Sequence, residues 1–177
     1  CTPEHLLSFA RWGAVYSDEI LGVAGPRVGQ LSIGAEPKKG MDLNVAAYEL
    51  LAASGLNFVG NIEGNHLLLG PCDVVVAGGF TGNNTLKLVE GFQRFLVGIA
   101  RRDDLAPALQ QAFGQVLQFM QQDFSDEADG GAALLGVRGV SIIAHGRSSS
   151  RAMANDVKVD CEQVRADLPA KLAAAQS

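Results

Sequence analysis

Cysteine, basic charge and long apolar runs are all scarce in this sequence, and each scarcity excludes a class of protein. The three cysteines, Cys1, Cys72 and Cys161, are too widely spaced for a disulfide framework or a CxxC metal motif, which suits a reducing cytoplasm. Lys and Arg number 14 against 19 Asp and Glu, and this net charge of -5 argues against a nucleic-acid partner. No apolar run approaches the roughly 18 residues of a membrane-spanning helix.

Metal ligands and the familiar nucleotide-binding motifs are also missing. His5 and His66 are isolated, so we expect no metal site. The glycine-rich segment GGFTGNN at 78–84 lacks the lysine of a Walker A loop, and its spacing does not match the dinucleotide fingerprint. Cys72 immediately precedes an apolar run, which makes it a poor nucleophile candidate at the wrong end of a strand. We therefore expect no cofactor, and the sequence offers no obvious nucleophile.

The sequence does contain an alternation of helical and strand-like patterns. Helical spacing of apolar residues marks 5–17 and 42–54, and a polar, alanine-rich helix is predicted at 151–175. Short apolar runs typical of strands occupy 26–34, 56–60, 73–78 and 140–146. Strands that alternate with helices predict a parallel sheet with both faces covered, which is an α/β fold.

A bundle-like pattern interrupts this alternation between 85 and 124. Apolar residues with 4-3-4 spacing occur twice, at Leu88, Phe92, Phe95 and Ile99, and again at Leu109, Phe113, Val116 and Met120. We predict a helical hairpin that projects from the sheet and pairs with a second subunit, although the spacing fits a hairpin folded onto its own domain equally well. The chain then divides into an α/β catalytic portion at 1–84, the hairpin at 85–124 and a return to the α/β portion at 125–177.

Each predicted strand runs into a polar, glycine-bearing loop, and these loops carry the candidate site. Ligands of open α/β sheets bind beyond the carboxyl ends of the strands, so the four loops are expected to converge. The segment at 78–84 is predicted to be a loop that leads into a helix N-terminus, where free N–H groups bind phosphate or an oxyanion. Asn83 is a neutral donor there, and Asn84 or Thr85 is a candidate helix cap. The alternative is that these residues only form a turn and cap the helix, without binding a ligand.

Further candidates come from the other three loops. Lys38 and Lys39 offer ammonium groups, whereas Asn61 and Glu63 offer a donor and a carboxylate. The last loop supplies further polar groups suited to an anion, His145, Arg147 and the serine run that begins at Ser148. An ordinary surface or turn role is the alternative for each of these residues.

Several of these segments together resemble one family. GPRVGQLSIGAEPKKG, SGLNFVGNIEG, DVVVAGGFTGNNTLKLVEG and AHGRSS occur in the order and at the distances of the C-terminal half of the phosphate acyltransferase (PlsX) family. The resemblance covers nearly the whole chain. It implies a Rossmann-like α/β/α sandwich of the isopropylmalate dehydrogenase/phosphotransacetylase type with a projecting helical hairpin, and by this resemblance the family's N-terminal half is absent from this sequence.

The resemblance also implies a reaction and a set of partners. The family makes acyl phosphate from acyl-acyl carrier protein and inorganic phosphate in bacterial fatty acid and phospholipid synthesis. It further implies a cytoplasmic homodimer, joined through the hairpin and peripherally associated with the inner face of the cell membrane. The alternatives are a phosphotransacetylase-like acyl-CoA:phosphate transferase and an inactive dimerising or membrane-docking fragment.

Two residues match the family's catalytic motifs. The lysine of the KKG motif falls on Lys39, and the asparagine of the FTGN motif falls on Asn83. Substrate-binding residues are expected at Asn61, Glu63, Gly79, Thr81, Gly82, His145 and Ser148. The chain departs from the family pattern at Gly78, where an aspartate is usual, and at Asn65 and His66.

Overall fold

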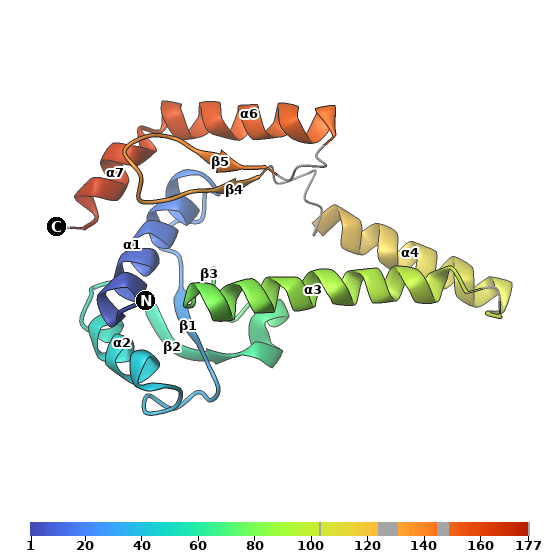
Figure 1. Cartoon of the computed structure of the whole chain (residues 1–177), viewed down its shortest axis with the longest axis horizontal. Helices are drawn as coiled ribbons and strands as arrows, with labels where there is room; N and C mark the ends of the chain where they lie inside the picture. The colour runs from blue at the N-terminus through green and yellow to red at the C-terminus, as the bar shows by residue number, and fades with distance from the viewer. Residues whose placement is uncertain (103, 124–130, 145–148, 177) are drawn as a thin grey trace.

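The computed structural model describes residues 1–102, 104–123, 131–144 and 149–176, with the side chains of 119–123 set aside. Helices and strands alternate as far as residue 76, and most of the described chain beyond that residue is helical. Figure 1 shows a mixed α/β body from which two long helices extend to one side.

The centre of the fold is a three-stranded parallel sheet. Its strands are β1 (Val28–Ser32), β2 (Phe58–Glu63) and β3 (Val74–Val76), in the order β2-β1-β3. The flanking helices are α1 (Pro3–Glu19) and α2 (Asp42–Ala52), which contact each other as well as the sheet. This arrangement confirms the predicted parallel α/β fold, and it is compatible with a Rossmann-like fold. The specific sandwich type stays a prediction.

One hydrophobic core joins α1 and α2 to the sheet. Its fully or almost fully buried members are Leu6, Ala10, Val28, Ala47, Leu51 and Val76. Burying a leucine side chain contributes about 2 kcal/mol, so Leu6 and Leu51 fix the two helices on this face. Val75 alternates onto the opposite face and is 39% exposed, so the covering of that face stays a prediction.

Strand β2 is longer than the sequence pattern indicates. We predicted that it ends at Gly60 and that a polar turn comes next, but Asn61 and Glu63 lie within the strand. Val59 is an extra residue in the pairing with β1, because Val28 pairs with Phe58 whereas the next residue pairs with Gly60. This bulge moves the rest of β2 by one position relative to β1. A 3₁₀ helix, η1 (Gly64–Leu69), comes directly after the strand.

The fourth predicted strand does not join the parallel sheet. Residues 142–143 form β5 (Ile142–Ile143), which pairs antiparallel with β4 (Ala132–Ala133) in a separate sheet. Periodicity identifies an apolar run but not its partner, and here the partner is a short segment that was not among the predicted strands. The prediction that this strand joins the parallel sheet is therefore wrong, and residues 145–148 of the loop expected after it lie outside the described residues.

Two long helices occupy the region of the predicted hairpin. They are α3 (Gly79–Ala100) and α4 (Pro107–Asp123), which contact each other and project from the sheet (Figure 1). Helix α3 begins six positions before Thr85, where we expected it, and none of its residues is buried. Among the described residues, no helix has the length and apolarity needed to cross a membrane.

The predicted C-terminal helix is two helices. They are α6 (Ser150–Arg165) and α7 (Leu168–Ala174). The break occurs at Asp167, which has a φ of 51°, a left-handed conformation that interrupts a helix. Leu168 and Leu172 are buried, and α7 contacts α1.

Candidate functional site

Three segments lie at the carboxyl ends of the parallel strands. They are residues 33–41 after β1, η1 after β2, and residues 78–83 after β3, which are the N-cap and the first residues of α3. Because the strands are parallel and β1 is central, these segments share one edge of the sheet with the 33–41 segment between the others. We call them the rim.

The start of α3 supplies free backbone donors to the rim. Gly78 is the N-cap residue, and because glycine has no side chain it makes no side-chain hydrogen bond to cap the helix. The first hydrogen bond of the helix runs from Gly82 N–H to the Gly78 carbonyl, at 2.8 Å. The N–H groups of residues 79–81 therefore have no partner within the helix, and the helix dipole adds partial positive charge. An anion fits this position.

The glycine-rich segment is helical, which corrects two expectations. We predicted a loop at 78–84 with Asn84 or Thr85 as the cap. Both residues instead lie inside α3, where Asn84 donates to the Phe80 carbonyl at 2.8 Å and Thr85 donates to the Thr81 carbonyl at 2.9 Å. These bonds return to the preceding turn, so neither side chain satisfies the start of the helix.

Asn83 lies one helical turn above the start of α3 and is exposed. It follows Gly79 by four positions, so the two residues share a face of the helix, and side chains in a helix lean toward its N-terminus. A Cβ atom at Gly79 would meet nothing within 4 Å. The face beneath Asn83 is therefore open. Thr81 and Gly82, the other candidates in this turn, are half-buried.

The 33–41 segment holds Lys39 at the rim. The side chain of Lys39 is exposed, but its backbone is fixed, because its N–H donates to the Glu36 carbonyl and its carbonyl accepts from the Ser32 hydroxyl, both at 3.0 Å. Gly40 has a φ of +108°, and a Cβ atom there would lie 2.8 Å from Ser32 Oγ. The return of the chain into α2 therefore requires glycine at this position.

Asn61 lies below the rim and is 8% exposed. Its Nδ2 donates to the Glu36 carbonyl at 2.8 Å, and its Oδ1 accepts from Gln30 Nε2 at 3.0 Å. Gln30 was not among the residues predicted from the sequence. The available signal was a glutamine in the middle of an apolar strand. Glu63 is half-buried at the end of β2, opposite Ser32.

The remaining candidate residues contribute little to the description of the site. His145, Arg147 and Ser148 lie outside the described residues. His66 is exposed on η1. Within the described ranges, no group of three or more His, Cys, Asp or Glu residues is placed to hold a metal ion. The candidate site therefore consists of the rim with Lys39, Asn83 and the start of α3, and the roles of its residues stay predictions.

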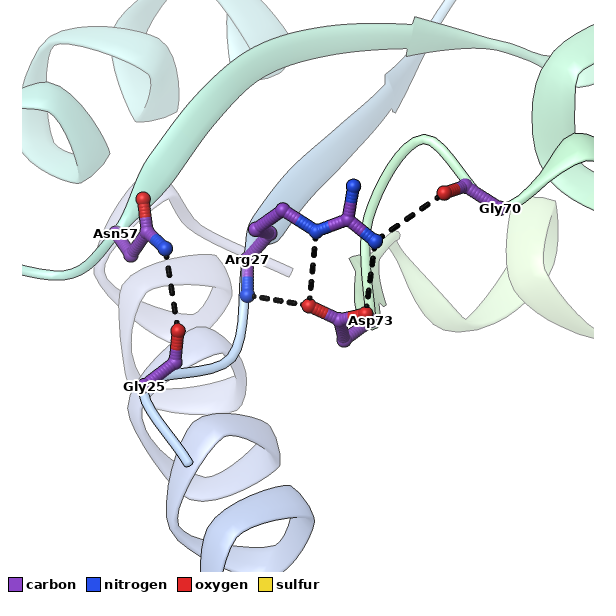
Figure 2. Close-up of polar contacts among 5 residues, drawn as sticks. All are labelled: Gly25, Arg27, Asn57, Gly70 and Asp73. Atoms are coloured by element: carbon purple, nitrogen blue, oxygen red, sulfur yellow. Dashed lines mark hydrogen bonds and ion pairs between the residues drawn. The ribbon is translucent and has the colours of Figure 1, made fainter. Parts of the chain in front are cut away.

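The opposite end of the sheet has a different character. Arg27 donates to both carboxylate oxygens of Asp73, at 2.9 and 3.0 Å, and to the Gly70 carbonyl at 3.2 Å (Figure 2). We call these three residues the clamp. The bonds from Arg27 lower the pKa of Asp73 from 3.8 to about 2. Burial raises the pKa of the Cys72 thiol, which lies at this end before β3, as expected. A thiol with a raised pKa is a poor nucleophile.

Comparisons with known proteins match this chain to one family and to several relatives. The profile of the family described as "Fatty acid synthesis protein" matches residues 1–171. A phosphate acyltransferase of Desulforamulus reducens is 41% identical over 95% of this chain and 51% of its own length. The phosphate acyltransferase of Moorella thermoacetica is 42% identical over 90% of this chain and 48% of its own length. That of Pelotomaculum thermopropionicum is 43% identical over 93% of this chain and 49% of its own length.

These relatives are similar to this chain along most of it. The chain nevertheless spans only about half the length of each relative. The family match covers both the rim and the clamp, as well as α3 and α4. The chain belongs to the fatty acid synthesis protein family.

Proposed function

We propose that this chain forms part of an enzyme that transfers an acyl group from acyl-acyl carrier protein to inorganic phosphate, for fatty acid and phospholipid synthesis. The observation that carries the proposal is the identity of 41–43%, along at least nine tenths of the chain, to proteins named phosphate acyltransferase. The rim supports it, because uncapped helix N–H groups and an exposed lysine suit a phosphate dianion.

The proposed reaction is a direct displacement at a thioester. A phosphate oxygen attacks the carbonyl carbon and forms a carbon–oxygen bond, and the carbonyl oxygen becomes an oxyanion. The intermediate then collapses, the carbon–sulfur bond breaks, and the thiolate leaves with the bonding electron pair. The products are acyl phosphate and the carrier thiol, which takes up a proton. The chemistry requires no protein nucleophile, in line with the raised pKa of Cys72.

Three groups of the rim have distinct roles in this proposal. The N–H groups at the start of α3 bind the phosphate. The Lys39 ammonium offsets negative charge on the phosphate and on the developing oxyanion. The Asn83 amide donates to the carbonyl oxygen, and a donor of this kind contributes about 3 kcal/mol to transition-state stabilisation.

The test uses the complete protein that contains these residues. Acyl-acyl carrier protein or acyl-CoA is supplied with and without inorganic phosphate, and acyl phosphate is trapped with hydroxylamine. We expect phosphate-dependent acyl phosphate formation from acyl-acyl carrier protein. Product from acyl-CoA alone would replace the proposal with an acyl-CoA:phosphate transferase, and no product from either donor would reject it.

We also propose that α3 and α4 form the contact between two subunits. A long helix with no buried residue is unusual for a monomer, because an apolar face normally packs against something. The exposed apolar side chains include Leu88, Phe92 and Phe95 on α3 and Leu109 and Val116 on α4. Phe92 and Phe95 lie with ring centroids 6.5 Å apart, which gives this surface an aromatic centre.

The double variant Phe92→Glu/Phe95→Glu tests the subunit contact. We expect the wild-type protein to have the mass of a dimer in light scattering and the variant to have that of a monomer. Arg94→Glu, a charge change between these positions, serves as the control and should leave the dimer intact. A variant that remains dimeric would reject the contact.

Peripheral membrane association is the alternative proposed for the same surface, because Phe92 and Phe95 cannot be buried in a subunit contact and in lipid at the same time. The exposed phenylalanines and leucines of α3 and α4 suit an interfacial contact with lipid. Flotation with phosphatidylglycerol vesicles is expected to carry the wild-type protein, and Phe92→Glu/Phe95→Glu should stay at the bottom of the gradient. Equal flotation of both proteins would reject this surface as the membrane contact.

A further inference from the structure

We infer that Gln30 and Asn61, the amide pair, are positioning residues that hold the Lys39 segment at the rim. The role of Lys39 in the reaction rests on the proposed function. The placement of the segment is independent of it. Gln30 is fully buried and Asn61 is 8% exposed, whereas Lys38 and Lys39 above them are exposed.

The amide pair forms a continuous chain of hydrogen bonds across two strands. Gln30 Nε2 on β1 donates to the Asn44 carbonyl of α2 at 2.9 Å and to Asn61 Oδ1 on β2 at 3.0 Å. Asn61 Nδ2 then donates to the Glu36 carbonyl at 2.8 Å. The chain therefore begins on the backbone of α2 and ends on the backbone of the 33–41 segment.

The two backbone carbonyls at its ends determine how both amides are oriented. A carbonyl oxygen can only accept, so Gln30 must direct its NH₂ group toward Asn44 and Asn61 must direct its NH₂ group toward Glu36. Asn61 then presents its oxygen to Gln30, which has a second N–H to donate. Reversing either amide would place two acceptors face to face. The arrangement thus has one consistent orientation.

The Glu36 carbonyl links the amide pair to Lys39. It accepts from Asn61 Nδ2 and also from the Lys39 N–H, at 3.0 Å. The turn at 36–39 is thereby tied to the interior of the sheet, and the Ser32 hydroxyl holds its other side through the Lys39 carbonyl. A shift of Asn61 would move the turn that carries Lys39.

The polarity of the amide pair is hard to explain by stability alone. Burying an amide costs free energy unless its hydrogen bonds are made, and two apolar side chains of the same shape would fill this volume without that requirement. Gln163 is also buried, at 2% exposed, but it lies on α6, which packs with α7, and not on a strand of the parallel sheet. A buried glutamine elsewhere in the chain thus provides a matched comparison.

The first test measures the order of the Lys39 segment without reference to activity. Limited trypsin digestion of the folded, complete protein, with mass-spectrometric identification of cleavage after Lys38 and Lys39, reports local opening. Each amide makes two of these hydrogen bonds, and losing them should raise this cleavage about tenfold or more in Asn61→Leu and in Gln30→Met. Gln163→Met should leave cleavage at this segment within about twofold of wild type, because distant sites act independently.

The double variant Gln30→Met/Asn61→Leu covers the case in which a single variant fails to fold. It replaces both partners by apolar groups of similar size, which is the milder change for the interior. Its Glu36 carbonyl still lacks the Asn61 donor, so the same increase in cleavage is expected. Wild-type cleavage in this folded double variant would overturn the inference.

The second test asks whether the amide pair acts through Lys39. Asn61→Leu should lower kcat/KM for acyl phosphate formation about tenfold in the wild-type background and less than about twofold when Lys39 is already methionine, since coupled residues are not additive. Equal losses in both backgrounds would overturn the positioning role. If the wild-type protein makes no acyl phosphate, the proposed function fails, and the trypsin comparison alone decides whether the amide pair holds the segment.

Discussion

The two ends of the parallel sheet are built on opposite principles. At the clamp, the charged groups bind each other, because Arg27 donates to both oxygens of Asp73 and to the Gly70 carbonyl. At the rim, the start of α3 is uncapped and the side chains of Lys39 and Asn83 are exposed. Charge that is already paired stabilises the fold, whereas charge and donors left open are available to a ligand.

The largest expected effect is the loss of activity when Asn83, an exposed donor at the rim, is replaced. Asn83→Ala in the complete enzyme should lower kcat about 100-fold, because one donor to the developing oxyanion is lost. The measurement is acyl phosphate formation at saturating substrate. Asn84→Ala is the matched control, since Asn84 donates to the Phe80 carbonyl within the helix. We expect this variant to retain most of the wild-type activity. Near-normal turnover of Asn83→Ala would remove the assignment.

The next effect, on stability and not on rate, compares glycines at the two ends of the sheet. Gly40 at the rim has a φ of +108° and would place a Cβ atom 2.8 Å from Asn44 Cβ and Ser32 Oγ, whereas Gly25 near the clamp has a φ of +61° and open space around it. Gly40→Ala should therefore cost about 3 kcal/mol of unfolding free energy and Gly25→Ala about 1 kcal/mol. Urea denaturation measures both. Equal losses of unfolding free energy in the two variants would show that the backbone at Gly40 is no more crowded than the backbone at Gly25.

The smallest expected effect concerns the clamp and depends on pH. The pKa of Asp73 is lowered from 3.8 to about 2, so its contribution to stability is complete above pH 3.8 and disappears as the pH falls through about 2. Asp73→Asn should therefore lower the melting temperature at pH 7, and the gap to wild type should narrow between about pH 4 and pH 2. A gap of constant size across this range would show that the ion pair is not its source.

Much of the fold was predictable because its elements have strong local patterns. Apolar residues at helical spacing identified α1 and α2, and short apolar runs identified the three parallel strands. The start of α3 was not predictable in the same way. Gly79, Gly82 and Asn83 have low helix propensity, and only the structure shows that the helix extends through them.

The site was also predictable only in part, because motifs in the sequence are local whereas contacts between strands are not. Motifs place Lys39 and Asn83 at the ends of strands, and the structure has them on rim segments. The bond between Gln30 and Asn61 depends on the bulge at Val59. Without that extra residue, the pairing of Val28 with Phe58 would continue and place Gln30 opposite Gly60. A register shift of one residue between strands distant in sequence leaves no local signal.

Binding of inorganic phosphate to the complete protein tests the contrast between rim and clamp most directly. Isothermal titration is performed on wild type, Lys39→Met and Arg27→Met, each well below its melting temperature. We predict that Lys39→Met weakens phosphate binding about tenfold, as expected for one charge-assisted hydrogen bond, while Arg27→Met leaves the affinity within about twofold. Loss of binding in Arg27→Met with wild-type affinity in Lys39→Met would contradict this contrast.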